Sequence, residues 1–222
     1  MNYSRCPDRD PRDRLRSMAR IPRKFQAGRC YHVMNRGNRR ATVFHKDRDY
    51  RALLRILAES QERVAMRVLA VCLMPNHFHF ILQPHENKDM SKWMHWVMTT
   101  QVARYRIANN TIGRIWAGRF KSFPIQHDAH LLAVLRYVER NALRAGLVSR
   151  AEDWRWGSLS WRGARRPMVT VTEPPVPLPN DWACWVNRPQ TSAELEAMRR
   201  CANSQTPFGD PEWVDRVKRG HD

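Results

Sequence analysis

The order of periodic segments predicts an α+β fold, a ferredoxin-like sandwich in which helices cover one face of a four-stranded antiparallel sheet. Strand-like and helix-like apolar patterns alternate along the chain in the order β-α-β-β-α-β-α. The pair Pro75-Asn76 joins two strand-like runs directly and predicts a hairpin. This order is typical of the ferredoxin-like arrangement, and it puts the second hairpin strand on an inner position of the sheet.

Each element has its own signal. The apolar run Met66 to Met74 is nearly continuous, as expected for a central strand. Asp128 precedes the third helix and is a favourable N-cap. The expected elements are strand 29–35, a helix around 50–57, strands 66–74 and 77–82, a helix around 90–105, strand 120–125 and helix 128–143.

Composition shifts divide the chain into four parts. Residues 1–24 are rich in Arg, Asp and Pro without periodicity, and we expect a basic, disordered arm. Residues 25–165 contain all the periodic elements and form the expected catalytic domain. Residues 166–180 are a proline-rich linker or surface strap, and 181–222 form a C-terminal extension that is too small to make a core alone.

The charge of the chain indicates a polyanionic partner. There are 39 Lys+Arg against 21 Asp+Glu, a formal charge of +18, and all but six of the basic residues are arginine. Such a balance favours nucleic acid, because arginine suits phosphates and base edges. A GC-rich genome, which enriches arginine everywhere, is an alternative explanation of the Arg bias, but it does not explain the net charge.

The same composition argues against a membrane or secreted protein. The longest apolar run, Val68 to Met74, is too short to cross a bilayer, and the N-terminus has no signal-like apolar segment. The five cysteines form no C-x-x-C pair, which indicates reduced thiols and disfavours a zinc ribbon. We therefore expect a cytoplasmic protein.

Two histidines separated by one residue form the most informative short motif. Because successive strand residues point to opposite faces, His77 and His79 share one face, while Phe78 points into the core. Their Cα atoms are then roughly 6 to 7 Å apart, close enough to converge on one divalent ion. A His-X-His triplet also arises by chance, so the metal assignment depends on what surrounds it.

The third expected helix carries a second group of polar residues. Leu131, Leu135 and Val138 form its core stripe, whereas Tyr137 and Asn141 are four residues apart on one edge. From that edge, both side chains can reach a metal-bound phosphate. The alternative is a boundary tyrosine that covers apolar surface while its hydroxyl stays solvated.

Three motifs in order resemble those of the REP-associated tyrosine transposases, members of the single-tyrosine HUH class of single-strand DNA transposases. The motif segments are Tyr31 to Asn38, Met74 to His79 and Arg136 to Val148, and Pro207 to Val214 is similar to C-terminal segments in that family. The resemblance covers roughly residues 22–165. It implies the same ferredoxin-like fold and a bacterial, nucleoid-associated protein.

The resemblance also implies roles for four residues. His77 and His79 are the implied metal ligands, Asn141 takes the place of a polar residue that helps to hold the metal, and Tyr137 is the implied nucleophile. The implied reaction is metal-dependent nicking and strand transfer on single-stranded or hairpin DNA through a 5′-phosphotyrosine link, without ATP. Mg²⁺ or Mn²⁺ is the expected cofactor, and Mn²⁺ tolerates imidazole ligands better. Relatives act as monomers or homodimers, so both states stay open.

DNA binding needs further residues. Arginines surround a glycine turn, and basic residues near the last strand alternate with aromatic ones, a combination that holds phosphates and stacks unpaired bases. The candidate DNA-binding residues are Arg36, Arg39, Arg40, Arg119 and Lys121.

Two alternative functions remain at this point. One is a domesticated hairpin-binding protein that no longer cuts, against which the intact histidines and tyrosine argue. The other is an RNA-binding module, which suits a ferredoxin-like sheet but lacks a clear aromatic RNA-binding signature.

Overall fold

A computed structural model describes residues 23–165 and 167–220, so the arm expected over 1–24 falls almost entirely outside the described residues. Its centre is one antiparallel sheet with the strand order β2-β3-β1-β4. The strands are β1 (Cys30–Arg36), β2 (Met66–Met74), β3 (His77–Pro84) and β4 (Lys121–Ile125). The predicted hairpin is confirmed, because β2 pairs with β3 across the Pro75-Asn76 turn. The prediction that the histidine strand is an inner one is confirmed too.

Two long helices cover one face of the sheet. They are α2 (Asp47–Arg63) and α3 (Asp89–Asn109), at the places where helical spacing predicted them. The alternate β3 residues Phe78, Phe80 and Leu82 point toward these helices and are fully buried with Trp93. Burial of such large apolar side chains stabilises the pairing of sheet and helices.

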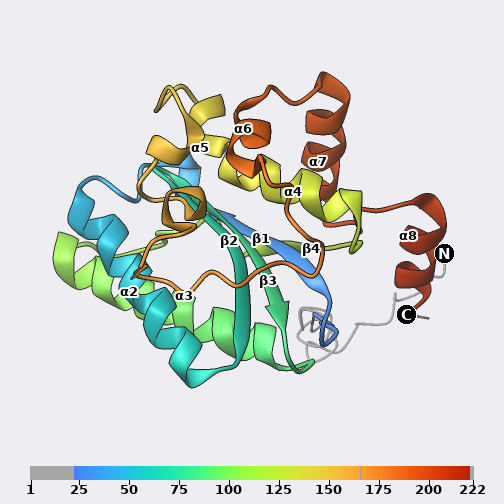
Figure 1. The fold of residues 1–222 in the computed structure, drawn as a ribbon. Helices are drawn as coiled ribbons and strands as arrows, with labels where there is room; N and C mark the ends of the chain where they lie inside the picture. Colours follow the sequence, from blue (N-terminus) through green and yellow to red (C-terminus); the bar gives the residue numbers. More distant parts are fainter. Residues whose placement is uncertain (1–22, 166, 221–222) are drawn as a thin grey trace, which may run out of the picture.

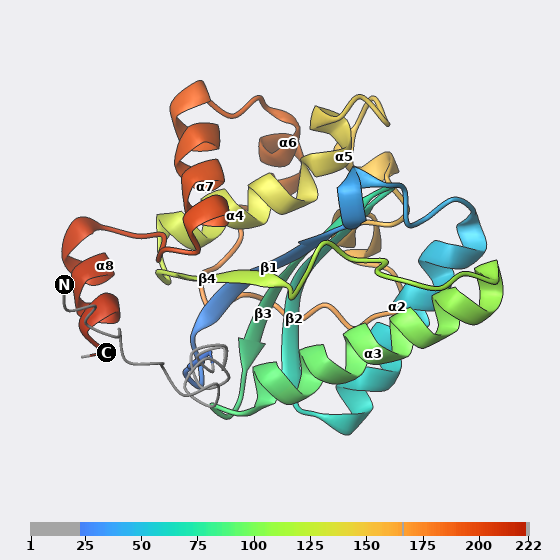
Figure 2. The same cartoon turned by 180° about the vertical axis from the view of Figure 1, so that it is seen from behind.

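The prediction that helices lie on one face only is wrong for the third helix. Figures 1 and 2 show α4 (Ala129–Glu139) on the side of the sheet opposite α2 and α3. Its residues Leu131, Leu135 and Val138 are fully buried against the second face, where they meet Ile81 and Phe123. The physical reason is the continuous apolar run of β2, which leaves hydrophobic side chains on both faces that need cover.

The remaining elements follow α4. A break at Arg140 separates α4 from the short helix α5, so the predicted helix 128–143 is two helices on nearly one axis. The shorter elements are η1 (Asn38–Arg40), α5 (Asn141–Arg144), η2 (Ala151–Asp153), η3 (Ser158–Trp161), α6 (Trp182–Asn187), α7 (Ser192–Ser204) and α8 (Pro211–Arg219).

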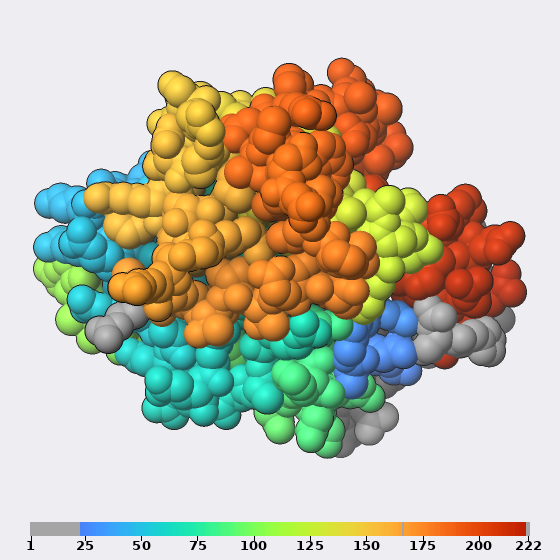
Figure 3. Space-filling model, viewed as in Figure 1, coloured from blue at the N-terminus to red at the C-terminus, as the bar shows by residue number. Residues whose placement is uncertain are grey.

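The C-terminal segments pack onto the second face. Trp182 and Val186 of α6 and Met198 of α7 are buried in the same apolar cluster as α4. Residues 167–181 run as a strap over β2 and α2, and Figure 3 shows residues 145–165 and 167–190, yellow to orange, spread over the centre of this view. Within the strap Val169 is fully buried, and the Thr172 amide donates to the Val68 carbonyl at 2.8 Å.

Segments of the chain itself cover part of each outer edge of the sheet. At β2 the Leu73 amide donates to the Trp156 carbonyl at 3.0 Å. At β4 the Phe208 amide donates to the Pro124 carbonyl at 2.9 Å, and the Phe208 carbonyl accepts from the Gln126 amide at 3.0 Å. Edge groups paired in this way are not free to pair with another chain. Among the described residues, no helix is long and apolar enough to span a membrane.

Candidate functional site

The histidine pair lies at the start of β3, on the face that α4 covers. His79 is 5% exposed and His77 is half-buried at the hairpin turn, with their ring centroids 4.9 Å apart. Each ring is held through Nδ1: that of His77 lies 2.6 Å from Asn76 Oδ1, and that of His79 lies 2.8 Å from His32 Nε2. Among the described residues, neither ring has a hydrogen bond to Nε2.

Sequence reasoning assigned no role to His32, and the structure places it beside His79. It is 1% exposed on β1 and packs edge-on against Phe123, with centroids 4.9 Å apart. The sequence signal for His32 was the alternation of β1, which puts Cys30, His32 and Met34 on one face of that strand. Sequence alone could not show that this is the same face of the sheet as that of His77 and His79, because it did not give the pairing of His32 with Ile81.

Tyr137 comes from α4 and faces the histidines. Asp128 begins this helix by accepting from the His130 amide at 2.7 Å, which confirms the predicted N-cap. The Tyr137 ring centroid lies 5.8 Å from that of His79 and 6.1 Å from that of His32. At 8% exposure the ring is more buried than a boundary tyrosine would be. The polypeptide thus brings the phenol and the histidine pair together within one chain.

Asn141 and Arg144 complete this side of the site. Asn141 is 2% exposed, and its Oδ1 accepts from Arg144 Nη2 at 3.2 Å. The Arg144 guanidinium carbon lies 4.2 Å from the centroid of the Tyr137 ring. The positive charge of Arg144 therefore lies over the face of the Tyr137 ring. The sequence analysis did not predict this contact.

Buried polar atoms without partners gather at this site. Among the described residues, Asn141 Nδ2, Arg144 Nη1 and His32 Nδ1 are buried and have no hydrogen-bond partner. An unsatisfied buried donor costs about 1–3 kcal/mol, so three around one tyrosine call for an explanation. The amide and guanidinium atoms are donors, and a phosphate oxygen is the acceptor that they fit.

The electrostatics keep the histidines neutral. Burial, with the nearby cations Arg36 and Arg144, lowers the pKa of His77 to about 4. Burial, together with the nearby His32, His77 and Arg144, holds the pKa of His79 well below its usual value, and burial alone lowers the pKa of His32 to about 3. Neutral imidazole with its Nδ1 held and its Nε2 free is the form that binds a metal ion. The residues present therefore fit a divalent cation at His77 and His79, and Asn141 stays the predicted third ligand.

Three predicted DNA-binding arginines lie next to the histidines. Arg36 pairs with His77 across the sheet, and Arg39 and Arg40 are exposed in the following turn. Both turn arginines have left-handed backbones, with φ of 52° and 63°, a conformation that costs a non-glycine residue free energy and is concentrated at functional sites. Gly37 makes the turn possible, because a Cβ there would meet the Ala41 carbonyl oxygen at 2.1 Å.

The other two predicted DNA-binding residues lie at and just before the start of β4. Lys121 is exposed at the start of β4, opposite Met34 of β1. Arg119 is exposed in the connection between α3 and β4. Neither side chain makes a hydrogen bond or ion pair with another described residue.

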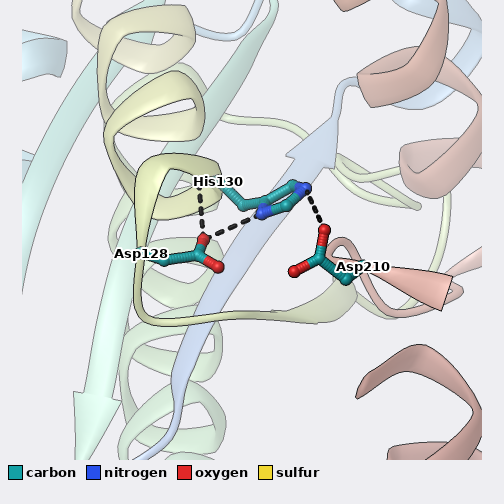
Figure 4. A group of neighbouring side chains, drawn as sticks. All are labelled: Asp128, His130 and Asp210. Carbon is teal, nitrogen blue, oxygen red and sulfur yellow. Dashed lines mark hydrogen bonds and ion pairs between the residues drawn. The ribbon is translucent and has the colours of Figure 1, made fainter. Parts of the chain in front are cut away.

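A second group of ligand-type side chains lies at the other end of α4. Figure 4 shows the His130 ring between two carboxylates: Nδ1 is 2.8 Å from Asp128 Oδ1, and Nε2 is 3.9 Å from Asp210 Oδ1. This group could hold a metal ion. One ligand atom of each of these three residues lies within 4.8 Å of the other two, and Asp210 is exposed. Residues 130 and 137 are also about 10 Å apart along the helix axis, so this group is separate from the tyrosine site.

Comparison with known proteins identifies the family of the chain. The family model described as "Transposase IS200 like" matches residues 26–141. A curated protein of Haemophilus influenzae named as a REP-associated tyrosine transposase is 28% identical over 107 residues, which are 44% of this chain. The match spans only 61% of the length of that relative.

A solved structure of a REP-associated tyrosine transposase bound to a REP hairpin has the same fold. The TM-score is 0.55, with 19% identity over 70% of this chain and 93% of that chain. The family match spans β1 to Asn141 and thus includes both histidines, the tyrosine and the sheet that joins them. The chain belongs to the IS200-like transposase family.

Proposed function

We propose that this protein is a metal-dependent endonuclease and strand transferase for single-stranded or hairpin DNA, with Tyr137 as the nucleophile. The observation that carries the proposal is the meeting of a phenol, two neutral imidazoles and two unpaired buried donors around one point. Hairpin DNA is proposed as substrate because the solved relative binds a REP hairpin, and the charge of +18 favours a polyanion.

The proposed reaction begins when the Tyr137 phenol loses its proton to solvent and the phenolate attacks a backbone phosphorus. The phosphorus–O3′ bond breaks, and the departing 3′ oxygen takes up a proton from solvent. The product is a 5′-phosphotyrosine with a free 3′-hydroxyl, and the reverse attack by a 3′-hydroxyl on that link transfers the strand. Phosphoester bond energy is kept in the link, so the reaction needs no ATP.

Each neighbouring residue has a defined part. Arg144 packs its guanidinium over the Tyr137 ring, and Asn141 Nδ2 and Arg144 Nη1 donate to phosphate oxygens. His77 and His79 hold Mg²⁺ or Mn²⁺, with Asn141 Oδ1 as a third donor. The bound cation would neutralise phosphate charge and align the scissile bond. His32 keeps the His79 ring in orientation through the contact between His32 Nε2 and His79 Nδ1.

The charge around the histidines couples metal and DNA binding. Among the described residues, no carboxylate lies within ion-pair distance of His32, His77 or His79, while Arg36 and Arg144 act on both ligands. A cation entering this site alone is repelled by the arginines. A phosphate supplies the missing negative charge, so metal and DNA are expected to bind cooperatively.

The experiment is to incubate the protein with labelled single-stranded hairpins and Mn²⁺, then look for a DNA conjugate that survives denaturant. We expect a conjugate with the native protein and none with Tyr137→Phe, while hairpin binding persists. Tyr105→Phe is the matched control, because Tyr105 lies on α3 near His45, and it should form the conjugate normally. An undiminished conjugate in Tyr137→Phe would remove Tyr137 from the mechanism. Hairpin binding without any conjugate in the native protein would instead favour the non-cutting alternative.

A further inference from the structure

The C-terminal extension contacts the helix that carries Tyr137. Figures 1 and 2 both show α6 beside the junction of α4 and α5. Arg136 and Arg140 extend from this junction to the last carbonyls of α6 and donate to them. The last carbonyls of a helix have no partner within it, and a cation is favoured beside them. We call residues 186–189, whose carbonyls accept these bonds, the α6 end.

Arg136 binds the α6 end in two ways. Its Nη2 donates to the Arg188 carbonyl at 2.6 Å and to the Pro189 carbonyl at 3.0 Å. Its guanidinium carbon also lies 4.6 Å from the centroid of the Trp185 ring. Only 6% of Arg136 is exposed. Because closely packed side chains transmit displacements, the α6 end helps to set the position of the α4 backbone next to Tyr137.

Arg140 lies at the break between the two helices. It is the C-cap of α4 and the N-cap of α5. Its Nη1 donates to the Val186 carbonyl at 3.2 Å and to the Asn187 carbonyl. The backbone before the break carries Tyr137, and the backbone after it carries Asn141. The Arg140 side chain therefore holds the point that relates these two site residues.

The Asn187 side chain ties the α6 end to a third segment. Its Oδ1 accepts from the Ala151 amide at 2.9 Å, and its Nδ2 donates to Glu152 Oε2 at 2.7 Å. Ala151 and Glu152 belong to η2, which follows α5. The α6 end is thus bonded to the chain on both sides of the segment from Tyr137 to Arg144. These bonds hold the α6 end itself in place.

We propose that Arg136 and Arg140 are positioning residues, which hold Tyr137 in line with its phosphate through the α6 end. The inference rests on the proposed function, because it takes Tyr137 as the nucleophile. A misplacement of about 1 Å can cost about a hundredfold in rate, so a phenol on a loosened helix attacks slowly. Both guanidinium groups bind the α6 end rather than the hairpin. Their loss therefore lowers the rate of attack and leaves hairpin affinity unchanged.

The test follows conjugate formation on excess labelled hairpin whose 3′-hydroxyl fragment is too short to stay bound. The final amount of conjugate then counts folded molecules, and the rate constant reports the placement of Tyr137. We expect Arg140→Ala to lower the rate constant about tenfold or more, with the native final amount of conjugate. Hairpin affinity, measured on Tyr137→Phe protein with and without this change, should stay within about twofold. Arg199→Ala, at an exposed position on α7 of the same extension, is the control and keeps the native rate constant.

A native rate constant in Arg140→Ala would overturn the inference, and so would a smaller final amount of conjugate formed at the native rate constant. Lysine variants carry the test if Arg140→Ala does not fold. Arg136→Lys and Arg140→Lys keep the charge but replace the planar fork by a point charge, so each should lower the rate constant about threefold or more. Native rate constants in both lysine variants would overturn the inference.

A second measurement observes Tyr137 without cleavage. In protein labelled with fluorotyrosine, the fluorine resonance of Tyr137 is identified by its loss in Tyr137→Phe. It should shift or broaden in Arg140→Ala, while the resonances of Tyr31, Tyr50 and Tyr105 on β1, α2 and α3 stay in place. An unchanged Tyr137 resonance would overturn the inference.

The two measurements separate this inference from the proposed function. Normal conjugate formation by the native protein, with native rate constants and an unchanged Tyr137 resonance in the Arg140 variants, rejects the positioning role alone. A shift confined to Tyr137 in a protein that forms no conjugate rejects the nickase and leaves the contact that holds Tyr137.

Discussion

Buried polar groups have hydrogen-bond partners in one region of the α4–α5 segment and lack them in another. Glu139 at the end of α4 is fully buried, yet its carboxylate accepts from Ser158 Oγ at 2.6 Å, Arg162 Nε at 3.0 Å and Trp182 Nε1 at 2.6 Å. Tyr137, two residues earlier, faces unpaired donors of Asn141 and Arg144.

The difference separates a structural region from a functional one. The Glu139 network ties α4 to η3 and α6, and all of its charge is compensated within the chain. The Tyr137 side keeps donors that the chain does not satisfy, at a cost of about 1–3 kcal/mol each. Changes on the Glu139 side should therefore reduce stability, and changes on the Tyr137 side should reduce activity.

The largest effect is expected from loss of a metal ligand. His77→Ala should slow conjugate formation at least about a hundredfold, because the cation supplies several kcal/mol of charge stabilisation. The thermal midpoint should change little, since His77 is half-buried at the turn. Gel assays of conjugate formation against time measure the rate. His85→Ala, at an exposed position on the following loop, is the control. Equal rates in the two variants would contradict the assignment.

The second prediction tests whether the Glu139 network stabilises the fold. Glu139→Ala leaves Arg162 and two further donors without their acceptor, and the free energy of unfolding should fall by about 3–5 kcal/mol. Urea unfolding measures it. Glu59→Ala removes an exposed pair with Arg104 (3.4 Å) and should lose about 1 kcal/mol or less. Similar losses in both variants would mean that the Glu139 network does not hold α4 in place.

The third change separates stability from function at one residue. His32→Leu removes a buried nitrogen that has no partner, but it also leaves the buried Nδ1 of His79 without its contact to His32 Nε2, so the two effects oppose each other and unfolding stability should change little. Without that contact, Mn²⁺ affinity in the presence of hairpin should fall about 10- to 100-fold. His32→Gln keeps a polar group near the position of Nε2 and should recover part of that affinity. Calorimetric titration measures the Mn²⁺ affinity of both variants, and unchanged affinity in His32→Leu would remove His32 from the site.

The smallest effect is on acid stability. Histidines of the unfolded chain take up protons below about pH 6.5, whereas His77 and His32 in the folded chain resist protonation until about pH 4 and about pH 3. The unfolded state then binds more protons, so stability falls as the pH drops from about 6.5 toward 4 and is unaffected by these groups above that window. Urea midpoints against pH should show a weaker fall for His32→Leu than for the native protein. Parallel curves would contradict the burial effect.

Periodicity predicted most of the strands and helices that carry these two regions, because strands and helices have distinct spacings. The hairpin, the Asp128 cap and the shared face of His77 and His79 all follow from local pattern. Sequence could not show that α4 crosses to the opposite face, since that depends on how much apolar surface β2 leaves uncovered.

Residues that depend on strand pairing or helix docking were also missed. His32 needed the pairing of β1 with β3, and Glu139 needed the docking of η3 and α6. Arg144 needed the continuation of the axis past Arg140, which places its guanidinium over Tyr137. These contacts join segments whose relative placement no local pattern encodes.

The central claim is that the two histidines hold a cation beside Tyr137 when DNA is bound. Electron spin resonance of Mn²⁺ in a complex of Tyr137→Phe protein with hairpin DNA tests it most directly. The account predicts magnetic coupling to two imidazole nitrogens, one of which disappears in His77→Ala. Coupling to no nitrogen, or to a single nitrogen that disappears in His130→Ala, would contradict it.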